Sequence, residues 1–278
     1  MKVIRARHAG ACYGVQRALD MAYAAICDGS TAYTLGPLIH NPQVVAELKQ
    51  RGVGEASSLD DIAEGIVIIR SHGVVPQVKQ EAERKGLPII DATCPHVARA
   101  QKAASSLAEA GYHVIAVGEA GHPEVEGMKA HAEITGKPCL VVATPDELPE
   151  HIDEPVGIVV QTTQAKEALD AVVDELLARG IEPQVKNTIC FATRQRQEAA
   201  AELAEQVDAL VVIGGRNSSN TTRLYDICKA VCPKSYHVEV PDEIDPAWFC
   251  GCAVVGVTAG ASTPEDQIAA VIERLETL

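Results

Sequence analysis

The chain has 278 residues, 47% of them apolar, and a formal net charge of −14 at neutral pH. This length is sufficient for a large core or for two or three small domains, and the apolar fraction excludes an intrinsically disordered chain. Because the sequence has no cluster of Lys and Arg to displace counterions, we expect no nucleic-acid partner.

Short apolar segments alternate with amphipathic ones along the chain, a pattern typical of α/β proteins. Helices are expected between the strands, and this alternation predicts parallel sheets joined by crossover helices. The expected strands span residues 3–7, 32–36, 66–70, 88–91, 113–118, 139–143, 157–161, 184–188, 210–214, 236–240 and 253–258.

Polar residues and glycines mark the ends of several expected helices. Asn41 and Thr263 are the predicted N-caps of two helices, because each is followed by a proline suited to the first helical position. Gly111 and Gly180 lie where glycine commonly ends a helix. The sequence shows no export signal and no apolar run near the roughly 20 residues of a membrane span, so we expect a cytoplasmic protein without a membrane partner.

Three of the nine cysteines form a repeat. Each follows an expected strand and precedes an expected helix, and the residue 24 positions later is a glycine. The residue 28 positions later is polar, and a later strand in each unit also ends in polar residues, at 71–73, 161–163 and 258–263. The matched sets are Cys12, Gly36 and His40; Cys94, Gly118 and His122; and Cys190, Gly214 and Ser218.

This repeat predicts three α/β units related by a pseudo-threefold axis. We expect unit boundaries at 13–94, 95–189 and 190–278, with residues 1–12 added to the third unit. That unit lacks a last strand before the chain ends, and the N-terminal strand at residues 2–7 would complete it. Ligands of open α/β sheets collect at the carboxyl ends of the strands, where all the repeated residues lie.

Two kinds of metal centre fit three converging thiolates. One is a cubane iron–sulfur cluster with one iron left open, and the other is a three-cysteine zinc site with one open position. We expect no disulfide framework, because the cysteine number is odd and no export signal precedes it. The remaining cysteines are expected to be buried or partly exposed thiols: Cys27, Cys139, Cys228, Cys232, Cys250 and Cys252.

A ring of polar side chains is expected around this centre. It is rich in neutral hydrogen-bond donors, and its Ser and Asn residues at 218–220 precede a helix, where backbone N–H groups favour an anion. Ordinary helix capping is the alternative reading of these three residues. The ring comprises His40, His72, His122, Thr162, Thr163, Ser218, Ser219, Asn220 and Ser262.

Two glutamates follow His122 at the start of an expected helix. A carboxyl group near the centre can carry a proton to a substrate, and Glu124 is the nearer of the two in sequence. A glutamate in a first helical turn also interacts favourably with the helix dipole, and the residue pattern does not rank Glu124 above Glu126.

These residues lie in motifs that resemble those of the 4-hydroxy-3-methylbut-2-enyl diphosphate reductase family, the last enzymes of the non-mevalonate isoprenoid pathway. The resemblance extends from Val3 to about Leu275. The motifs are "GPLIHN" at 36–41, "SHGV" at 71–74, "DATCP" at 91–95, "GHPEVEG" at 121–127, "QTT" at 161–163, "NSSNT" at 217–221 and "GVTAGAS" at 256–262, with Cys12 and Cys190 in two further motifs.

The resemblance implies a trefoil of three α/β units around one [4Fe–4S] cluster that is held by Cys12, Cys94 and Cys190, with one iron not ligated by cysteine. The polar ring is then expected to bind the diphosphate of an allylic substrate. Glu124 resembles the proton-delivery residue, and Thr162 and His122 accompany it.

The implied reaction is a reductive dehydroxylation that yields isopentenyl and dimethylallyl diphosphate, using two electrons and two protons. A ferredoxin or flavodoxin is the implied one-electron donor, and the protein is expected to be a monomer. Two alternatives remain at this point: an open-iron enzyme similar to quinolinate synthase, and a non-enzymatic iron–sulfur sensor.

Overall fold

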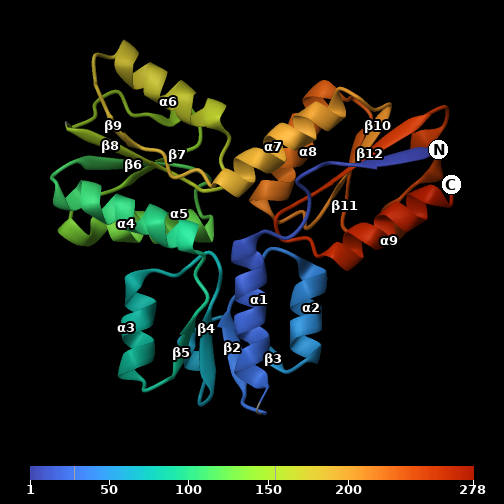
Figure 1. Ribbon diagram of the computed structural model, residues 1–278. Helices are drawn as coiled ribbons and strands as arrows, with labels where there is room; N and C mark the ends of the chain where they lie inside the picture. The colour runs from blue at the N-terminus through green and yellow to red at the C-terminus, as the bar shows by residue number, and fades with distance from the viewer. Residues whose placement is uncertain (28, 154) are drawn as a thin grey trace. The chain divides into compact units, whose positions relative to one another are not determined.

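The computed structural model describes residues 1–27, 29–153 and 155–278 (Figure 1). Within these ranges the chain forms twelve β-strands and nine α-helices, and the strands make three separate sheets of four strands each. Every strand pair is parallel. The predicted α/β class, with three parallel-sheet units, is therefore confirmed.

The first sheet has the strand order β3-β2-β4-β5. Its strands are β2 (Ala32–Leu35), β3 (Val53–Ala56), β4 (Ile66–Ile69) and β5 (Ile89–Asp91). The helices in this part of the chain are α1 (Tyr13–Ile26), α2 (Pro42–Gln50) and α3 (Pro76–Arg84).

The second sheet has the order β7-β6-β8-β9. Its strands are β6 (His113–Val117), β7 (Leu140–Val142), β8 (Val156–Val160) and β9 (Gln184–Lys186), and its helices are α4 (Pro95–Glu109), α5 (Pro123–Ala132) and α6 (Lys166–Ala178).

The third sheet has the order β1-β12-β10-β11. Its strands are β1 (Lys2–Arg5), β10 (Ala209–Ile213), β11 (Ser235–Val238) and β12 (Val254–Ala259), and its helices are α7 (Phe191–Ala204), α8 (Ser219–Val231) and α9 (Glu265–Glu276). The N-terminal strand β1 pairs with β12, with Val3 opposite Val255, so it completes this sheet as expected from the sequence.

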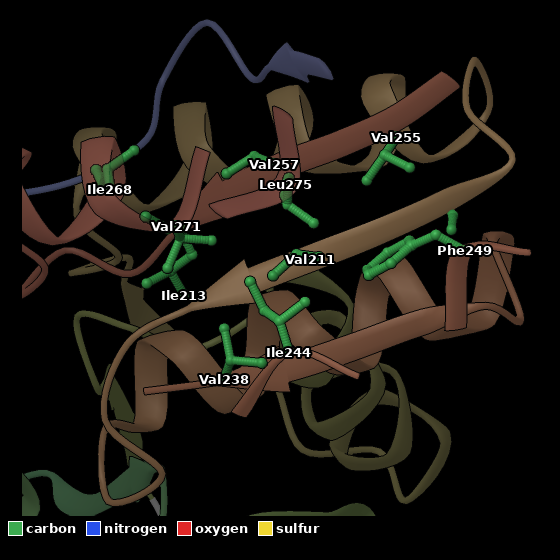
Figure 2. Close-up of a cluster of buried hydrophobic side chains, with 12 residues drawn as sticks. Val211, Ile213, Val238, Ile244, Phe249, Val255, Val257, Ile268, Val271 and Leu275 are labelled. Atoms are coloured by element: carbon green, nitrogen blue, oxygen red, sulfur yellow. The ribbon is translucent and has the colours of Figure 1, made fainter. Parts of the chain in front are cut away.

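Apolar strands and one amphipathic helix form the core of the third sheet (Figure 2). Val211 and Val257 on neighbouring strands are fully buried, as are Ile268, Val271 and Leu275 of α9. The spacing of three and four residues places these α9 side chains on one helical face, which packs against the sheet. Because helices cover parallel sheets on both faces, the central strands β10 and β12 are apolar almost throughout rather than alternating.

Chain contacts group the residues into two compact units. The first unit consists of residues 1–16, 40–44 and 191–278, and it contains the third sheet. The second consists of residues 17–39 and 45–190, and it contains the other two sheets. None of the helices in the described ranges combines the length and apolarity that a membrane span requires.

Most of the predicted helix ends are confirmed, and one is wrong. The Asn41 side chain accepts hydrogen bonds from the amides of Gln43 (3.1 Å) and Val44 (3.2 Å), and Gly111 and Gly180 have positive φ angles of 92° and 82°. Thr263, in contrast, is not an N-cap, because α9 begins at Glu265 after Pro264. The buried Thr263 hydroxyl donates instead to the carbonyl of Ile213 at the end of β10 (3.1 Å).

Candidate functional site

The three repeat cysteines occupy the same local position in the fold. Cys12, Cys94 and Cys190 each immediately precede a helix, and each backbone N–H donates to a carbonyl that follows a neighbouring strand. The bonds run from Cys12 to Ala261 (3.0 Å), from Cys94 to Ser71 (2.9 Å) and from Cys190 to Thr162 (2.9 Å). The polar segments after β4, β8 and β12 therefore adjoin the three cysteines, one segment to each.

Burial separates these thiols from Cys139 and Cys228. All nine cysteines are free, and the three repeat cysteines are partly exposed, whereas Cys139 and Cys228 are buried. Burial raises the pKa of both Cys139 and Cys228 to about 12, so these two remain protonated thiols at neutral pH. A metal ligand must be a thiolate, and Cys139 and Cys228 are accordingly poor candidates.

The repeat cysteines divide between the two compact units. Cys12 belongs to the first unit, and Cys94 and Cys190 belong to the second. Among the described residues, the structure does not assemble three His, Cys, Asp or Glu side chains into a metal site.

The second unit brings Glu124 and Thr162 into direct contact. Glu124, the second residue of α5, is 1% exposed. Its carboxylate accepts the backbone N–H of Thr162 at 2.5 Å and the Thr162 hydroxyl at 2.9 Å. Burial raises the pKa of Glu124 to about 7, although the two bonds from Thr162 oppose this shift. The carboxyl group can therefore release and regain a proton near neutral pH, as a general acid requires.

Glu126 has a different environment. Its side chain is only partly buried, and its Oε1 accepts the backbone N–H of Gly121 at 3.2 Å. The structure therefore ranks the two glutamates that the residue pattern left equal, because Glu124 is almost completely buried and Glu126 is not.

The raised pKa of Glu124 predicts a pH-dependent effect on stability. Between pH 4.5 and about 7 the folded chain holds a proton on Glu124 that the unfolded chain has lost. The folded state is therefore fully stabilised below pH 4.5 and loses this stabilisation as the pH rises to about 7. We expect Glu124→Gln, which does not ionise, to gain up to about 3 kcal/mol relative to wild type between pH 5 and 8 in urea unfolding. If the free energy of unfolding differed between variant and wild type by the same amount at pH 5 and at pH 8, the raised pKa of Glu124 would be contradicted.

His72 and His122 lie edge to face in the same unit, with ring centroids 5.7 Å apart and planes at 82°. The Nδ1 atom of His122 accepts the backbone N–H of Glu124 at 3.2 Å, so its proton is on Nε2. Burial and the positive charge of Arg70 lower the pKa of His122 to about 4. His122 is therefore a neutral donor at physiological pH, not a cation.

The first unit holds the Ser218–Asn220 segment at the start of α8. Ser218 is the N-cap, and its hydroxyl accepts from the backbone N–H of Thr221 at 3.4 Å, so the capping interpretation applies to Ser218. Asn220 is 3% exposed, and neither its side-chain oxygen nor its nitrogen has a hydrogen-bond partner among the described residues. Buried polar groups are almost always bonded, so this amide is suited to a polar ligand.

His40 and Ser262 also meet in the first unit. The Ser262 hydroxyl donates to the backbone carbonyl of His40 at 2.9 Å, and the Asn41 amide donates to the carbonyl of Ser262 at 3.0 Å. Ser219 is buried at the first position of α8, and in the second unit Thr163 accepts a hydrogen bond from Gln161 at 3.1 Å. The predicted ring residues are thus divided between the two units, with His72, His122, Thr162 and Thr163 in the second.

Arg70 is a cation beside the predicted site that the sequence analysis did not single out. This residue follows β4 directly and precedes the "SHG" segment that contains His72. Its position after an apolar strand, at the edge where the repeated residues lie, was the available signal.

Comparison with known proteins agrees with these features. The model of the family described as "LytB protein" matches residues 3–276. A relative from Geotalea uraniireducens (strain Rf4), named 4-hydroxy-3-methylbut-2-enyl diphosphate reductase, is 49% identical over 281 residues, covering 100% of this chain and 98% of the relative. A relative of the same name from Pelobacter propionicus (strain DSM 2379 / NBRC 103807 / OttBd1) is 50% identical over 276 residues and covers 99% and 98% of the two chains.

Two solved structures are also similar. One, described as (E)-4-hydroxy-3-methyl-but-2-enyl diphosphate reductase, the terminal enzyme of the non-mevalonate pathway, is 44% identical with a TM-score of 0.73 over 100% of both chains. The other, an E-1-hydroxy-2-methyl-but-2-enyl-4-diphosphate reductase from Plasmodium falciparum, is 26% identical with a TM-score of 0.90 over 98% of this chain and 87% of that one. Since the family model and the curated relatives each match nearly the whole chain, this chain belongs to the LytB protein family and is a reductase.

Proposed function

We propose that this chain converts 4-hydroxy-3-methylbut-2-enyl diphosphate into isopentenyl and dimethylallyl diphosphate. In this reaction a C–O bond breaks, the substrate takes up two electrons and two protons, and one water molecule leaves. The relatives' names point to this substrate. The observation of the structure that supports it best is the buried Glu124–Thr162 pair, with a carboxyl pKa of about 7.

An iron–sulfur cluster fits the thiols of this chain. Cys12, Cys94 and Cys190 are free, partly exposed and placed at helix starts, and cysteine thiolates are the protein ligands that hold such clusters. We assign to them one [4Fe–4S] cluster with one iron not ligated by cysteine. When bound, such a cluster supplies single electrons and an open coordination position on that iron. Each of the three ligands would lie at a boundary of the predicted α/β units, which span 13–94, 95–189 and 190–278 with 1–12.

The proton role falls to Glu124. A hydroxyl group leaves far more easily as water than as hydroxide, so a proton must reach its oxygen. Thr162 fixes the carboxyl group through two hydrogen bonds, and the raised pKa keeps a large fraction of it protonated at neutral pH. Thr162 would also orient the substrate hydroxyl or a water molecule, and His122 lies next to Glu124 in the same helix start.

The diphosphate is assigned to a ring of neutral donors. Asn220 contributes a buried amide without a partner among the described residues, at the start of α8, where backbone N–H groups favour an anion. His122 contributes a neutral imidazole with its proton on Nε2. The ring residues assigned to the diphosphate are His40, His72, His122, Thr163, Ser218, Ser219, Asn220 and Ser262.

Asn220→Ala is expected to weaken the binding of inorganic pyrophosphate roughly 10- to 150-fold. A hydrogen bond to a charged group is worth roughly 1.5–3 kcal/mol, and the alanine removes both polar atoms of the amide. Calorimetric titration of the cluster-loaded protein measures this loss, while the visible spectrum of the cluster should stay unchanged. Asn217→Ala is the matched control, because Asn217 is exposed three residues earlier. Equal affinities for wild type and Asn220→Ala would remove Asn220 from the anion site.

The partners follow from the chemistry. A single cluster passes electrons one at a time, so we assign a ferredoxin or flavodoxin as donor, and we propose a monomer that works in the cytoplasm. The test of the function itself is anaerobic product formation from the allylic diphosphate with a one-electron reductant.

A further inference from the structure

Arg70 is a half-buried cation without a carboxylate partner. Its Nε donates weakly to the carbonyl of Gly73 at 3.4 Å. Its Nη1 lies beside Gly36, because a Cβ atom built on this glycine would be only 3.1 Å from that nitrogen. No carboxylate of the described residues lies within 4.0 Å of the guanidinium. Burial lowers the pKa of Arg70, but an arginine stays charged at physiological pH.

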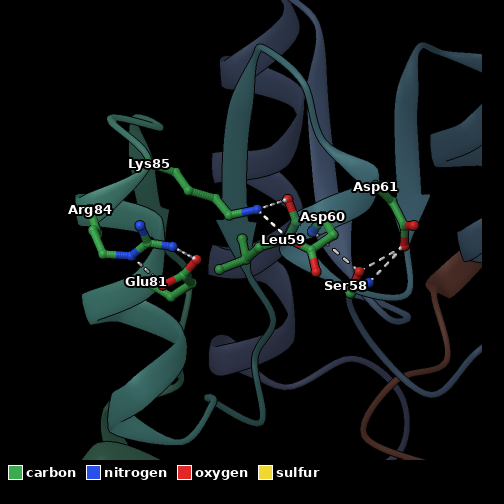
Figure 3. A network of polar contacts seen from close by, with 7 residues as sticks. All are labelled: Ser58, Leu59, Asp60, Asp61, Glu81, Arg84 and Lys85. Carbon is green, nitrogen blue, oxygen red and sulfur yellow. Dashed lines mark hydrogen bonds and ion pairs between the residues drawn. The ribbon is translucent and has the colours of Figure 1, made fainter.

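Two of the four carboxylates that line a cavity beside Arg70 are already paired with other cations. Arg70 borders a cavity of about 660 Å³ whose lining also includes the carboxylates of Glu55, Asp60, Glu81 and Glu126. Asp60 is bound to Lys85 and Glu81 to Arg84, each at 2.5 Å (Figure 3). None of the four carboxylates lies within 4.0 Å of the Arg70 guanidinium, so Arg70 has no direct ion pair among the described residues, and a half-buried charge without one is unfavourable for the fold.

Arg70 adjoins all three segments that carry the predicted anion-binding histidines. Gly36 belongs to the "GPLIHN" segment, Gly73 to "SHGV", and the charge of Arg70 acts on His122 of "GHPEVEG". Arg70 is also only two residues from His72, whose ring lies against that of His122. These contacts all lie within the second compact unit.

A diphosphate group needs positive charge as well as hydrogen bonds. It carries more than one negative charge, whereas the proposed ring contains no Lys or Arg side chain. His122 does not supply charge, because its pKa lies at about 4. Moving an anion from water into such a ring is costly unless a cation lies near it.

We propose that Arg70 is a positioning residue that supplies the positive charge for the diphosphate end of the substrate, acting through the histidine pair His72–His122. This inference rests on the proposed function. The role proposed for Arg70 depends on its charge and not on a hydrogen bond to the substrate. Arg70 is not one of the predicted ring residues.

Three variants test the charge of Arg70. Arg70→Met keeps most of the side-chain stem without the charge, Arg70→Lys keeps the charge, and Arg84→Met removes the same charge from an exposed arginine of α3 in the same unit. Calorimetry of cluster-loaded protein measures inorganic pyrophosphate binding at low and at high salt. The kcat and KM values for the allylic diphosphate are measured alongside.

Arg70→Met should weaken pyrophosphate binding at low salt about 10-fold. This factor is the magnitude expected when one charge attracts an anion across a medium that is partly screened by water. The difference from wild type should shrink at high salt, because salt screens the charge. Arg70→Lys should recover most of the affinity, and Arg84→Met should stay within about twofold of wild type. KM should rise in Arg70→Met while kcat stays close to the wild-type value.

Several results would overturn the proposal. One is wild-type pyrophosphate affinity in Arg70→Met, and another is a loss of affinity in Arg70→Lys as large as that in Arg70→Met. A loss of affinity independent of salt would assign Arg70 a purely structural role. Failure of the proposed function can be distinguished from failure of this proposal. Wild-type protein would then bind pyrophosphate without reducing the allylic diphosphate, and the calorimetry would still decide the role of Arg70.

Discussion

Replacing Cys94 with serine should remove nearly all of the iron and all activity, and Cys12→Ser and Cys190→Ser should do the same. The three thiolates are the proposed ligands, and a serine hydroxyl is a much harder donor with a far higher pKa, so it holds iron poorly. Iron and sulfide content, together with the brown visible absorbance of the anaerobically purified protein, measure this loss directly.

Two cysteines outside the repeat provide the controls. Cys250 is exposed, and Cys139 is buried with a pKa of about 12, so neither is a proposed ligand. Cys250→Ser and Cys139→Ser should keep iron content and colour near wild type. If Cys139→Ser lost the cluster while Cys94→Ser kept it, the threefold repeat would not be the ligand set.

Glu124→Gln should keep the cluster, still bind substrate, and turn over at least about 100-fold more slowly than wild type. Glutamine retains the shape of the side chain and can accept the backbone N–H of Thr162, but it has no proton to give. In wild type, a step limited by this proton should slow as the pH rises above about 7, because the protonated fraction of Glu124 falls. Steady-state turnover across this pH range, with cluster content measured in parallel, tests both expectations.

Glu126→Gln is the matched control for this variant. Glu126 lies two residues away on the same helix, is less buried, and binds the backbone of Gly121. It should lose far less activity than Glu124→Gln. Near-normal turnover of Glu124→Gln would exclude Glu124 from the proton path, and water held by Thr162 would then be the next candidate.

The strands could be predicted well because buried parallel strands are continuous apolar runs. The exception is β3, whose sequence Val-Gly-Glu-Ala has neither an apolar run nor a clear alternation. Its place beside β2 comes from main-chain pairing, from Ala32 opposite Val53 to Leu35 opposite Ala56, and a sequence pattern does not show this. Thr263 was assigned as a cap because it precedes a proline, but the nearby Ile213 carbonyl binds its hydroxyl instead.

The candidate site could be predicted where spacing carries the signal. Cys12, Cys94 and Cys190 precede helices at matched distances from glycines, and the structure places each next to a strand end. Burial, in contrast, depends on residues far away in the chain. The contact of Glu124 with Thr162, 38 positions later, and the missing counter-charge of Arg70 both come from tertiary packing and could not be read from the sequence.

The family assignment also decides between the functions that the sequence left open. A match of the LytB family model over residues 3–276, with relatives near 50% identity, identifies a reductase rather than a quinolinate-synthase-like enzyme or a sensor. The variants above test the proposed cluster and the residue roles separately.

The most direct test of the whole account is anaerobic turnover of 4-hydroxy-3-methylbut-2-enyl diphosphate by the cluster-loaded protein with a one-electron reductant. The account predicts that isopentenyl and dimethylallyl diphosphate appear together, that two electrons are consumed for each product molecule, and that Glu124→Gln with full cluster content forms them at least about 100-fold more slowly. Wild-type protein with a complete cluster that consumed no substrate, or that consumed it without forming either diphosphate, would contradict the account.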